Sequence, residues 1–262
     1  MMLRPFSFYL VLFWALLVTR PVSAQNIDAL GRQVPWVAAA LSEFLSDSRA
    51  FVARLEVQVP GDAGEKPAKL PFTIVMDEGQ LRLDLKLSEV TSDLMPAEFL
   101  TPLKQAGWER VMLLYHPKAS TRLVVPAEKA YVEFPKDTNG PSKMENDAAQ
   151  KLGVMEKKLL GIESVDGHPC RKYRLTGKAG QEIEEAYVWE ATDLNTLPIK
   201  LFVKADGQVY NFQLRQVKLG KPDARLFTVP KEYRKAGSAQ ELVAGVLFKS
   251  IGSGKSPFTL SE

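Results

Sequence analysis

The chain has 262 residues, of which 45% are hydrophobic and 25% charged; 34 basic and 31 acidic residues give a formal net charge of +3. The ordinary Gly and Pro contents exclude collagen-like and low-complexity proteins, and a single cysteine excludes a scaffold of internal disulfides. With one cysteine and two histidines, a site that needs several such metal ligands is excluded as well. No motif indicates catalysis, so we expect no enzyme activity, no cofactor and no metal.

The first 24 residues have the features of a secretory signal peptide. Arg4 is followed by an apolar run over residues 6–18, and small residues precede a cleavage point after Ala24. Because an α-helix needs about 20 apolar residues to cross a bilayer, this run is short for an anchor and typical of a signal peptide. We predict cleavage before Gln25, export to the periplasm and a mature chain that does not span the membrane. An uncleaved N-terminal anchor is the alternative.

Cleavage would also remove Arg4 and Arg20, which lowers the formal net charge to +1. A nearly neutral chain with interspersed charges has no basic stripe that could follow a phosphate backbone, so nucleic acid is not an expected partner. Residues 25–262 contain no linker long enough to divide them, and we expect a single domain.

Helical spacing occurs near both ends of the mature chain. In residues 34–45, Val37, Leu41, Phe44 and Leu45 fall on one side of a predicted helix, which we expect to act as a lid. The sequence that begins at Ser238 and includes Glu241 has the form of a capping box and predicts a second helix. Residues 96–106 are ambiguous and suggest a short helix broken by Pro102.

The central chain alternates apolar and polar residues with a period of two, which predicts antiparallel strands. Residues 72–76 and 81–87 flank the turn residues 77–79 and form the clearest predicted hairpin. The sequence predicts about ten strands with a helix near each end. The remaining strand candidates are residues 51–59, 108–115, 121–125, 130–134, 154–164, 170–176, 183–190, 199–204 and 209–218.

A sheet with one apolar face must cover that face, either with a packed core or with a ligand. The alternation alone leaves both possibilities open, since methionines suit an adaptable binding surface and fill cores equally well. The residues that we predict for a ligand-binding hydrophobic face are Leu55, Val57, Phe72, Ile74, Met76, Leu83, Leu85, Met112 and Leu114.

His168, Cys170 and Glu163 are the residues whose chemistry would suit a metal site or a nucleophile. The other histidine, His116, lies in a different predicted turn, so the set is incomplete. We expect residues 167–169 to turn a hairpin and Cys170 to be a small buried side chain at the start of the next strand. Residues 227–229, followed by Pro230, are expected to form a last edge strand.

Residues 74–84, 131–135, 161–173, 193–200 and 222–233 resemble a family of exported bacterial proteins related to LolA, the periplasmic carrier of lipoproteins. The resemblance implies a mainly β fold in which one strongly curved antiparallel sheet, an unclosed half-barrel, has α-helices covering its concave side and holds acyl chains between them. The carrier has a Lys-Arg-Pro stretch where this chain has residues 79–84, with only Arg82 as a counterpart. The resemblance therefore implies binding of a lipid or apolar ligand rather than lipoprotein transfer as such.

Two kinds of function follow. The first is a periplasmic binding or carrier protein that shields a lipid, a lipoprotein acyl chain or another apolar ligand. The second is an envelope structural or interaction protein with a packed core, which binds a protein partner along an exposed strand edge. An enzyme would need a catalytic constellation that the sequence does not contain.

Overall fold

The computed structural model describes residues 35, 38–39, 41–42, 44–45, 50–59, 67–90, 97–134, 156–176, 183–205, 207–239 and 241–242. The predicted signal peptide, Val37 and the helix expected beyond Leu242 lie outside the described residues. The first described residues, among them Pro35, Leu41 and Phe44, are helical and end in a turn at Leu45; we refer to the described residues between 35 and 45 as the N-terminal helix.

In the part of the chain that the structure describes, twelve strands form one sheet, in the order β12-β6-β5-β4-β3-β2-β1-β11-β10-β9-β8-β7. The strands are β1 (Ala50–Val59), β2 (Ala68–Asp77), β3 (Gln80–Lys86), β4 (Arg110–Tyr115), β5 (Thr121–Val125), β6 (Ala130–Phe134), β7 (Glu156–Val165), β8 (His168–Thr176), β9 (Ile183–Ala191), β10 (Leu197–Ala205), β11 (Gln208–Leu219) and β12 (Arg234–Ala236). Neighbouring strands are antiparallel except for β12, which pairs with β6 in parallel.

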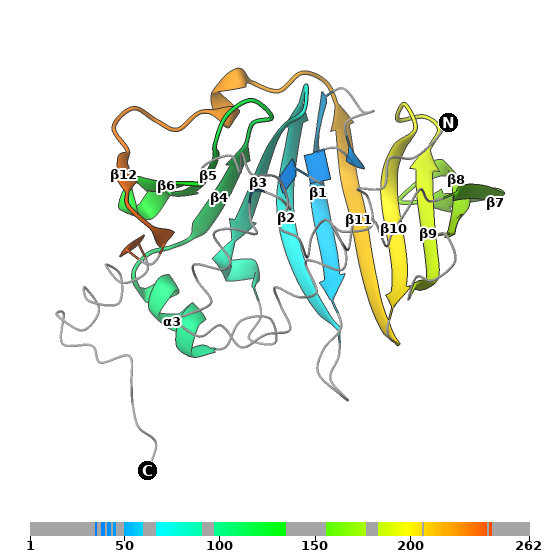
Figure 1. Cartoon of the computed structure of the whole chain (residues 1–262), viewed down its shortest axis with the longest axis horizontal. Coiled ribbons are helices and arrows are strands. Elements are labelled where there is room, and N and C mark those ends of the chain that lie inside the picture. Colours follow the sequence, from blue (N-terminus) through cyan, green and yellow to red (C-terminus); the bar gives the residue numbers. More distant parts are fainter. Residues whose placement is uncertain are drawn as a thin grey trace, which may run out of the picture.

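The sheet is curved and does not close, because β7 and β12 are its two ends and do not pair with each other (Figure 1). This confirms the predicted fold class of a mainly β, unclosed sheet. The expected number of about ten strands was low. The predicted edge strand at residues 227–229 was wrong, because the end strand β12 is Arg234–Ala236.

Two tight hairpin turns place backbone in the left-handed region. The β2–β3 turn has Glu78 at φ 48° and Gly79 at φ 80°, and the β7–β8 turn has Asp166 at φ 52° and Gly167 at φ 85°. Two consecutive residues with positive φ match the right-handed twist of the flanking strands. The first turn confirms the predicted hairpin. The second lies one residue earlier than expected, because His168 and Pro169 already belong to β8.

The sheet has two unlike faces. The apolar face carries Leu55, Ile74, Leu83 and Leu201, and the N-terminal helix packs in the same hydrophobic cluster. The polar face carries the alternate residues of the same strands. Arg54 and Glu56 of β1, for example, lie opposite Arg215 and Gln213 of β11. Period-two alternation produces this division, because successive side chains point to opposite sides of a strand.

A second cluster lies at the β6 end of the sheet and involves α3 (Ala97–Gln105). Leu100 of α3, Trp108 and Leu242 are buried there with residues of β5 and β6. Pro102 does not break this helix, contrary to the expectation, and α3 continues through it to Gln105. The short helices η3 (Leu87–Glu89) and η4 (Pro126–Glu128) follow β3 and β5.

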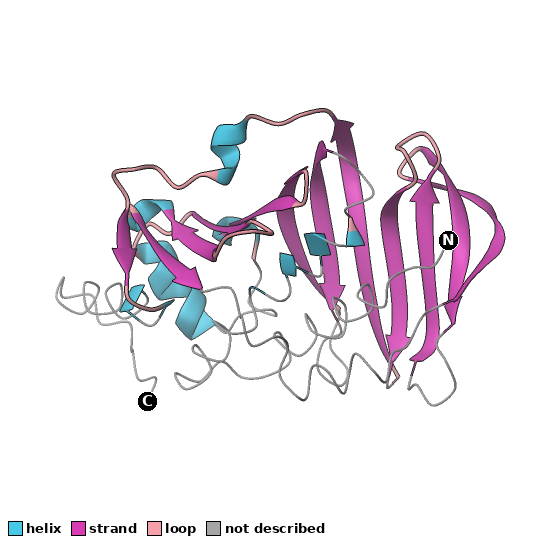
Figure 2. Cartoon of the chain, turned by 45° about the horizontal axis from the view of Figure 1, so that its top comes forward, coloured by secondary structure: helices cyan, strands magenta, loops and turns pink. Residues whose placement is uncertain are grey.

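Residues 220–233 join β11 to β12 and are called the connecting segment below. Figure 2 shows this segment as loop with one short helical turn, η5 (Ala224–Phe227). Arg82 on the polar face donates a hydrogen bond to the carbonyl oxygen of Leu226, at 2.9 Å. Val229 and Tyr233 pack on Met112 and its neighbours. The connecting segment therefore covers the polar face of the β3–β6 half.

Candidate functional site: the apolar face

Seven of the nine predicted face residues share the apolar face. Leu55 of β1 lies opposite Phe72 of β2, and Phe72 lies opposite Leu85 of β3. Ile74 and Leu83 form the next pair toward the turn. Val57 and Met76 belong to the same cluster, and all seven are buried apart from Leu85, which is partly buried.

Met112 and Leu114 are on the polar face, so their predicted place on the apolar face was wrong. Met112 lies opposite Asp84, and Leu114 lies opposite Arg82. The residues of β4 that continue the apolar face are Val111 and Leu113, which pair with Leu85 and Leu83. Met112 and Leu114 are nevertheless buried, because the connecting segment packs over them.

The apolar face extends further than the sequence predicted, across β11, β10 and β9. Phe212 pairs with Val57 on one side and with Leu201 on the other, and Leu201 pairs with Val188 of β9. Each of these residues is buried and belongs to the same cluster as Leu55. The period-two pattern of β10 and β11 could have identified Leu201 and Phe212, whereas the residues around Val188 in β9 are apolar on both sides.

The N-terminal helix contributes the buried side chains of Ala38, Leu41, Phe44 and Leu45 to this cluster. The ring of Phe44 meets that of Phe212 edge to face, with centroids 6.0 Å apart. Ser42 donates a hydrogen bond from Oγ to the carbonyl oxygen of Gly79 in the β2–β3 turn, at 2.6 Å. Leu41, Phe44 and Leu45 are therefore packed against the apolar face of the sheet.

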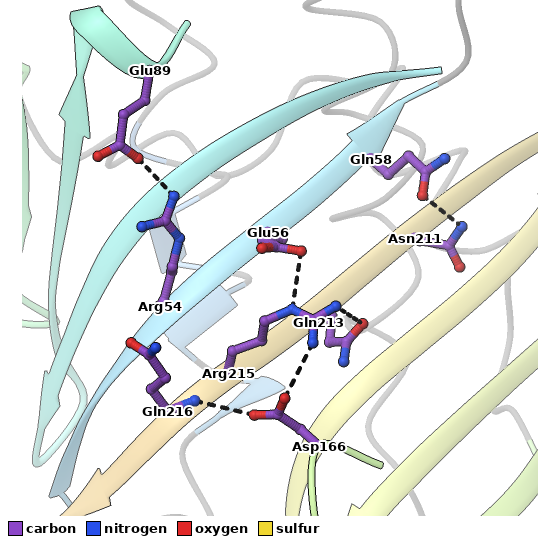
Figure 3. A network of polar contacts seen from close by, with 9 residues as sticks. All are labelled: Arg54, Glu56, Gln58, Glu89, Asp166, Asn211, Gln213, Arg215 and Gln216. Atoms are coloured by element: carbon purple, nitrogen blue, oxygen red, sulfur yellow. Dashed lines mark hydrogen bonds and ion pairs between the residues drawn. The ribbon is translucent and has the colours of Figure 1, made fainter. Parts of the chain in front are cut away.

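The polar face of β1 and β11 carries a network of charged and amide side chains (Figure 3). Arg215 donates to Glu56 at 3.1 Å and to Asp166 at 3.1 Å, and Asp166 also accepts from the backbone N–H of Gln216. Arg54 pairs with Glu89 of η3 at 2.7 Å. These contacts tie the β7–β8 turn and η3 to the centre of the sheet.

Farther along, the polar face of β7–β10 combines lysines with aromatic rings. The ammonium groups of Lys172 and Lys200 both lie over the ring of Trp189, at 5.0 Å and 4.5 Å from its centroid. Glu163 accepts from Lys172 at 2.8 Å and from the indole N–H of Trp189 at 2.7 Å. These two hydrogen bonds lower the pKa of Glu163 and keep it ionised.

The residues that we considered for catalysis or metal binding have structural roles in this arrangement. Cys170 is buried, which raises the pKa of its thiol, and its Sγ lies 3.4 Å from the carbonyl oxygen of His168. His168 contacts Asp193 through Nδ1 at 2.8 Å. Glu163 is engaged by Lys172 and Trp189. Within the described residues, no three ligating side chains are grouped to hold a metal ion.

A separate pocket of about 930 Å³ lies beside the second cluster. Lys86, Lys104 and Arg110 contribute basic groups to its lining, which also includes Trp108 and Glu109. The sequence carries no signal for these residues, because they come from the ends of β3, α3 and β4 and show no common spacing. The pocket lies outside the cluster formed by Leu55, Ile74 and their neighbours.

Within the part of the chain that the structure describes, no helix has the length and apolar character needed to cross a membrane. No family model and no curated protein matches the sequence.

Several solved structures are similar to the chain. A MucA/MucB complex from Pseudomonas aeruginosa matches with a TM-score of 0.42 and 16% identity, over 82% of this chain and 65% of the other. A LolA superfamily protein from Nitrosomonas europaea matches with a TM-score of 0.34 and 13% identity, over 79% and 98%. The Mycobacterium tuberculosis lipoprotein LppX matches with a TM-score of 0.38 and 10% identity, over 76% and 99%.

The chain spans less than two thirds of the MucB structure that it matches. A LolA superfamily protein is among the matched structures, as the sequence resemblance predicted, and this likeness concerns the fold alone. The residues of the sheet itself therefore provide the basis for the functional proposal.

Proposed function

We propose that the protein is an exported binding or carrier protein that shelters a lipid, a lipoprotein acyl chain or another apolar ligand between the apolar face and the N-terminal helix. One observation carries the proposal: a single apolar cluster extends from β4 across β1 to β8, and a short helix closes part of it. Eight adjacent strands, spaced at about 4.8 Å, span roughly 34 Å, whereas a helix is about 10 Å wide.

The attachment of the N-terminal helix supports its role as a displaceable lid. Among the described residues, its packing side chains are apolar, and the hydrogen bond from Ser42 to Gly79 is its polar link to the sheet. Leu41, Phe44 and Leu45 each gain roughly 1.5–3 kcal/mol from burial, which totals about 5–9 kcal/mol. An acyl chain of about sixteen carbons gains roughly 12 kcal/mol at about 0.8 kcal/mol per methylene. An entering chain can therefore offset the loss of the lid contacts.

The alternative reading, a packed core without a ligand, makes a different prediction for Ser42→Ala. If the helix is a lid, loss of the Ser42 hydrogen bond costs the closed state about 1 kcal/mol, and a fluorescent fatty acid should bind about five-fold more tightly. If the helix is part of a permanent core, the variant should lose stability and bind no probe.

Ser88→Ala is the matched control, because Ser88 is exposed on η3 and does not belong to the apolar cluster. It should leave both probe affinity and stability at the wild-type values. Titration of the mature protein with the probe, followed by thermal unfolding of each variant, separates the two outcomes. Wild type and Ser42→Ala that both fail to bind any acyl probe would exclude the carrier function.

A second candidate, partner binding along a strand edge, is favoured by one feature. The end strand β7 exposes Leu159, Leu160 and Ile162 to solvent. Leu159 lies opposite Tyr173 of β8, which packs against the apolar cluster, so this exposed edge borders the apolar face.

A further inference from the structure

The end strand β7 is a long unpaired edge with exposed apolar side chains. It has ten residues and, among the residues that the structure describes, pairs on one side only, with β8. Leu159 is 55% exposed, Leu160 49% and Ile162 73%. Such an edge presents backbone donors and acceptors that can pair with another strand.

The usual protection of an edge strand is incomplete in β7. Lysines and bulges commonly prevent edge-to-edge pairing, and β7 has both. Lys157, however, is bonded to Glu190 within the chain, so its charge is already paired. The opposite end strand, β12, has only three residues, and Arg234 and Lys235 are both exposed. The two edges of the sheet are therefore not equally protected.

The bulge in β7 also changes which residues share a face. The register with β8 shifts between Leu159 and Gly161, so that Lys158 lies opposite Arg174 and Glu163 lies opposite Cys170. Residues five apart fall on opposite faces of a regular strand, but the extra residue brings Lys158 and Glu163 to the same face. By the same shift, Leu159 and Ile162 share the other face.

We propose that β7 pairs antiparallel with β7 of a second copy of this chain, about a two-fold axis between Leu160 and Gly161. In this register Lys158 lies opposite the partner's Glu163, and Leu159 lies opposite the partner's Ile162. Leu160 lies opposite the partner's Gly161, which has no side chain to obstruct it. The two-fold axis repeats each contact, which gives two Lys–Glu pairs on one face and an apolar group of four side chains on the other.

The alternation of charge and apolar side chains selects this register. A shift of one residue in either direction places Lys158 opposite Ile162 or Ser164. The first of these shifts places Glu163 opposite Lys157, but the Lys157 side chain lies on the other face of β7 and is bonded to Glu190. A further shift places Glu156 opposite Glu163, where like charges repel. Glu163 is held in place by Lys172 and Trp189, so its carboxylate is positioned at the edge before any partner binds.

Sedimentation of the mature protein over a dilution series tests the dimer. A single strand pair is a small interface, so we expect a reversible dimer that dissociates on dilution. Ile162→Asp should yield a monomer, because each of the two chains would then place a carboxylate in the apolar group. Ser164→Asp, on the same strand but outside that group, should retain the dimer. A wild-type monomer at every concentration, or a dimer that Ile162→Asp leaves intact, would overturn the proposal.

Cysteine pairs test the register independently of stability. An equimolar mixture of Lys158→Cys and Glu163→Cys chains should form an intermolecular disulfide on oxidation, because the two positions face each other on one side of the strand pair. A mixture of Lys158→Cys and Ser164→Cys chains should not, since those side chains point to opposite faces. The native Cys170 is buried and does not compete. Equal cross-linking in both mixtures would exclude this register.

Discussion

At the scale of single residues, Glu133 joins three strands at one end of the sheet. From β6 it accepts hydrogen bonds from Lys235 of β12, from Ser120 before β5 and from Arg122 within β5. These donors, with Lys235 as the largest contributor, lower the pKa of Glu133 to about 2. A three-residue parallel strand such as β12 forms few backbone hydrogen bonds, so this carboxylate is an important part of its attachment.

The lowered pKa of Glu133 predicts a pH-dependent stability. Since the folded pKa lies below the ordinary value of 4.5, folding favours the ionised carboxylate. The stabilisation is fully present above the unfolded pKa and is lost as the pH falls toward 2. Denaturant unfolding at several pH values should therefore show Glu133→Gln less stable than wild type at neutral pH, with the difference disappearing near pH 2.

Two lysine variants complete this test. Lys235→Met removes the strongest donor to Glu133 and should reproduce a large part of the loss of stability that Glu133→Gln shows. Lys221→Met is the control: it changes an exposed lysine of the connecting segment and should keep the pH dependence of stability of the wild type. A stability difference between wild type and Glu133→Gln that stays constant down to pH 2 would contradict this account of the carboxylate.

At the scale of elements, the β7–β8 hairpin depends on a turn that only particular residues adopt easily. Gly167 has φ 85°, and a Cβ placed there would meet nothing within 4 Å. Gly167→Ala should therefore cost about 1 kcal/mol through backbone conformation alone. Gly167→Asn should cost less, because Asn tolerates the left-handed region. Equal losses for both variants in chemical denaturation would show that the turn conformation is not the cause.

The strands that the sequence predicted well are those with strict alternation. In residues 72–76 and again in residues 81–87 every second residue is apolar, and a turn with positive φ separates the two strands, so both the pairing and the buried face followed from the pattern. In β4 the run from Val111 to Leu114 is apolar on both sides, and the pattern cannot give the phase. The face on which Met112 and Leu114 lie could not be predicted, because the connecting segment, which is distant in sequence, buries the second side of β4.

Two further differences have local causes. Asp223 accepts a hydrogen bond from the backbone N–H of Arg225 and caps η5, so Phe227 ends a short helix instead of beginning a strand. The strand β12 consists of Arg234, Lys235 and Ala236, which show no apolar alternation. Its place beside β6 depends on contacts between residues about a hundred positions apart, such as Lys235 with Glu133.

At the scale of the whole molecule, an open sheet leaves two different surfaces for function. Its apolar face is a continuous surface closed in part by the N-terminal helix, and its β7 edge carries exposed apolar side chains. A closed barrel would have no such edge, and a sheet of alternating strands without a helix would leave its apolar face in water. The proposed ligand would therefore bind the apolar face, and the proposed second copy would pair with the β7 edge.

The most direct test of the central claim is native mass spectrometry of the protein purified from the cells that make it, followed by solvent extraction of the bound material. We expect a species heavier than the polypeptide by about one acyl-bearing molecule per chain, which solvent extraction then releases for identification. A polypeptide that carries no bound lipid, from cells in which it is made at its natural level, would contradict the proposed carrier function.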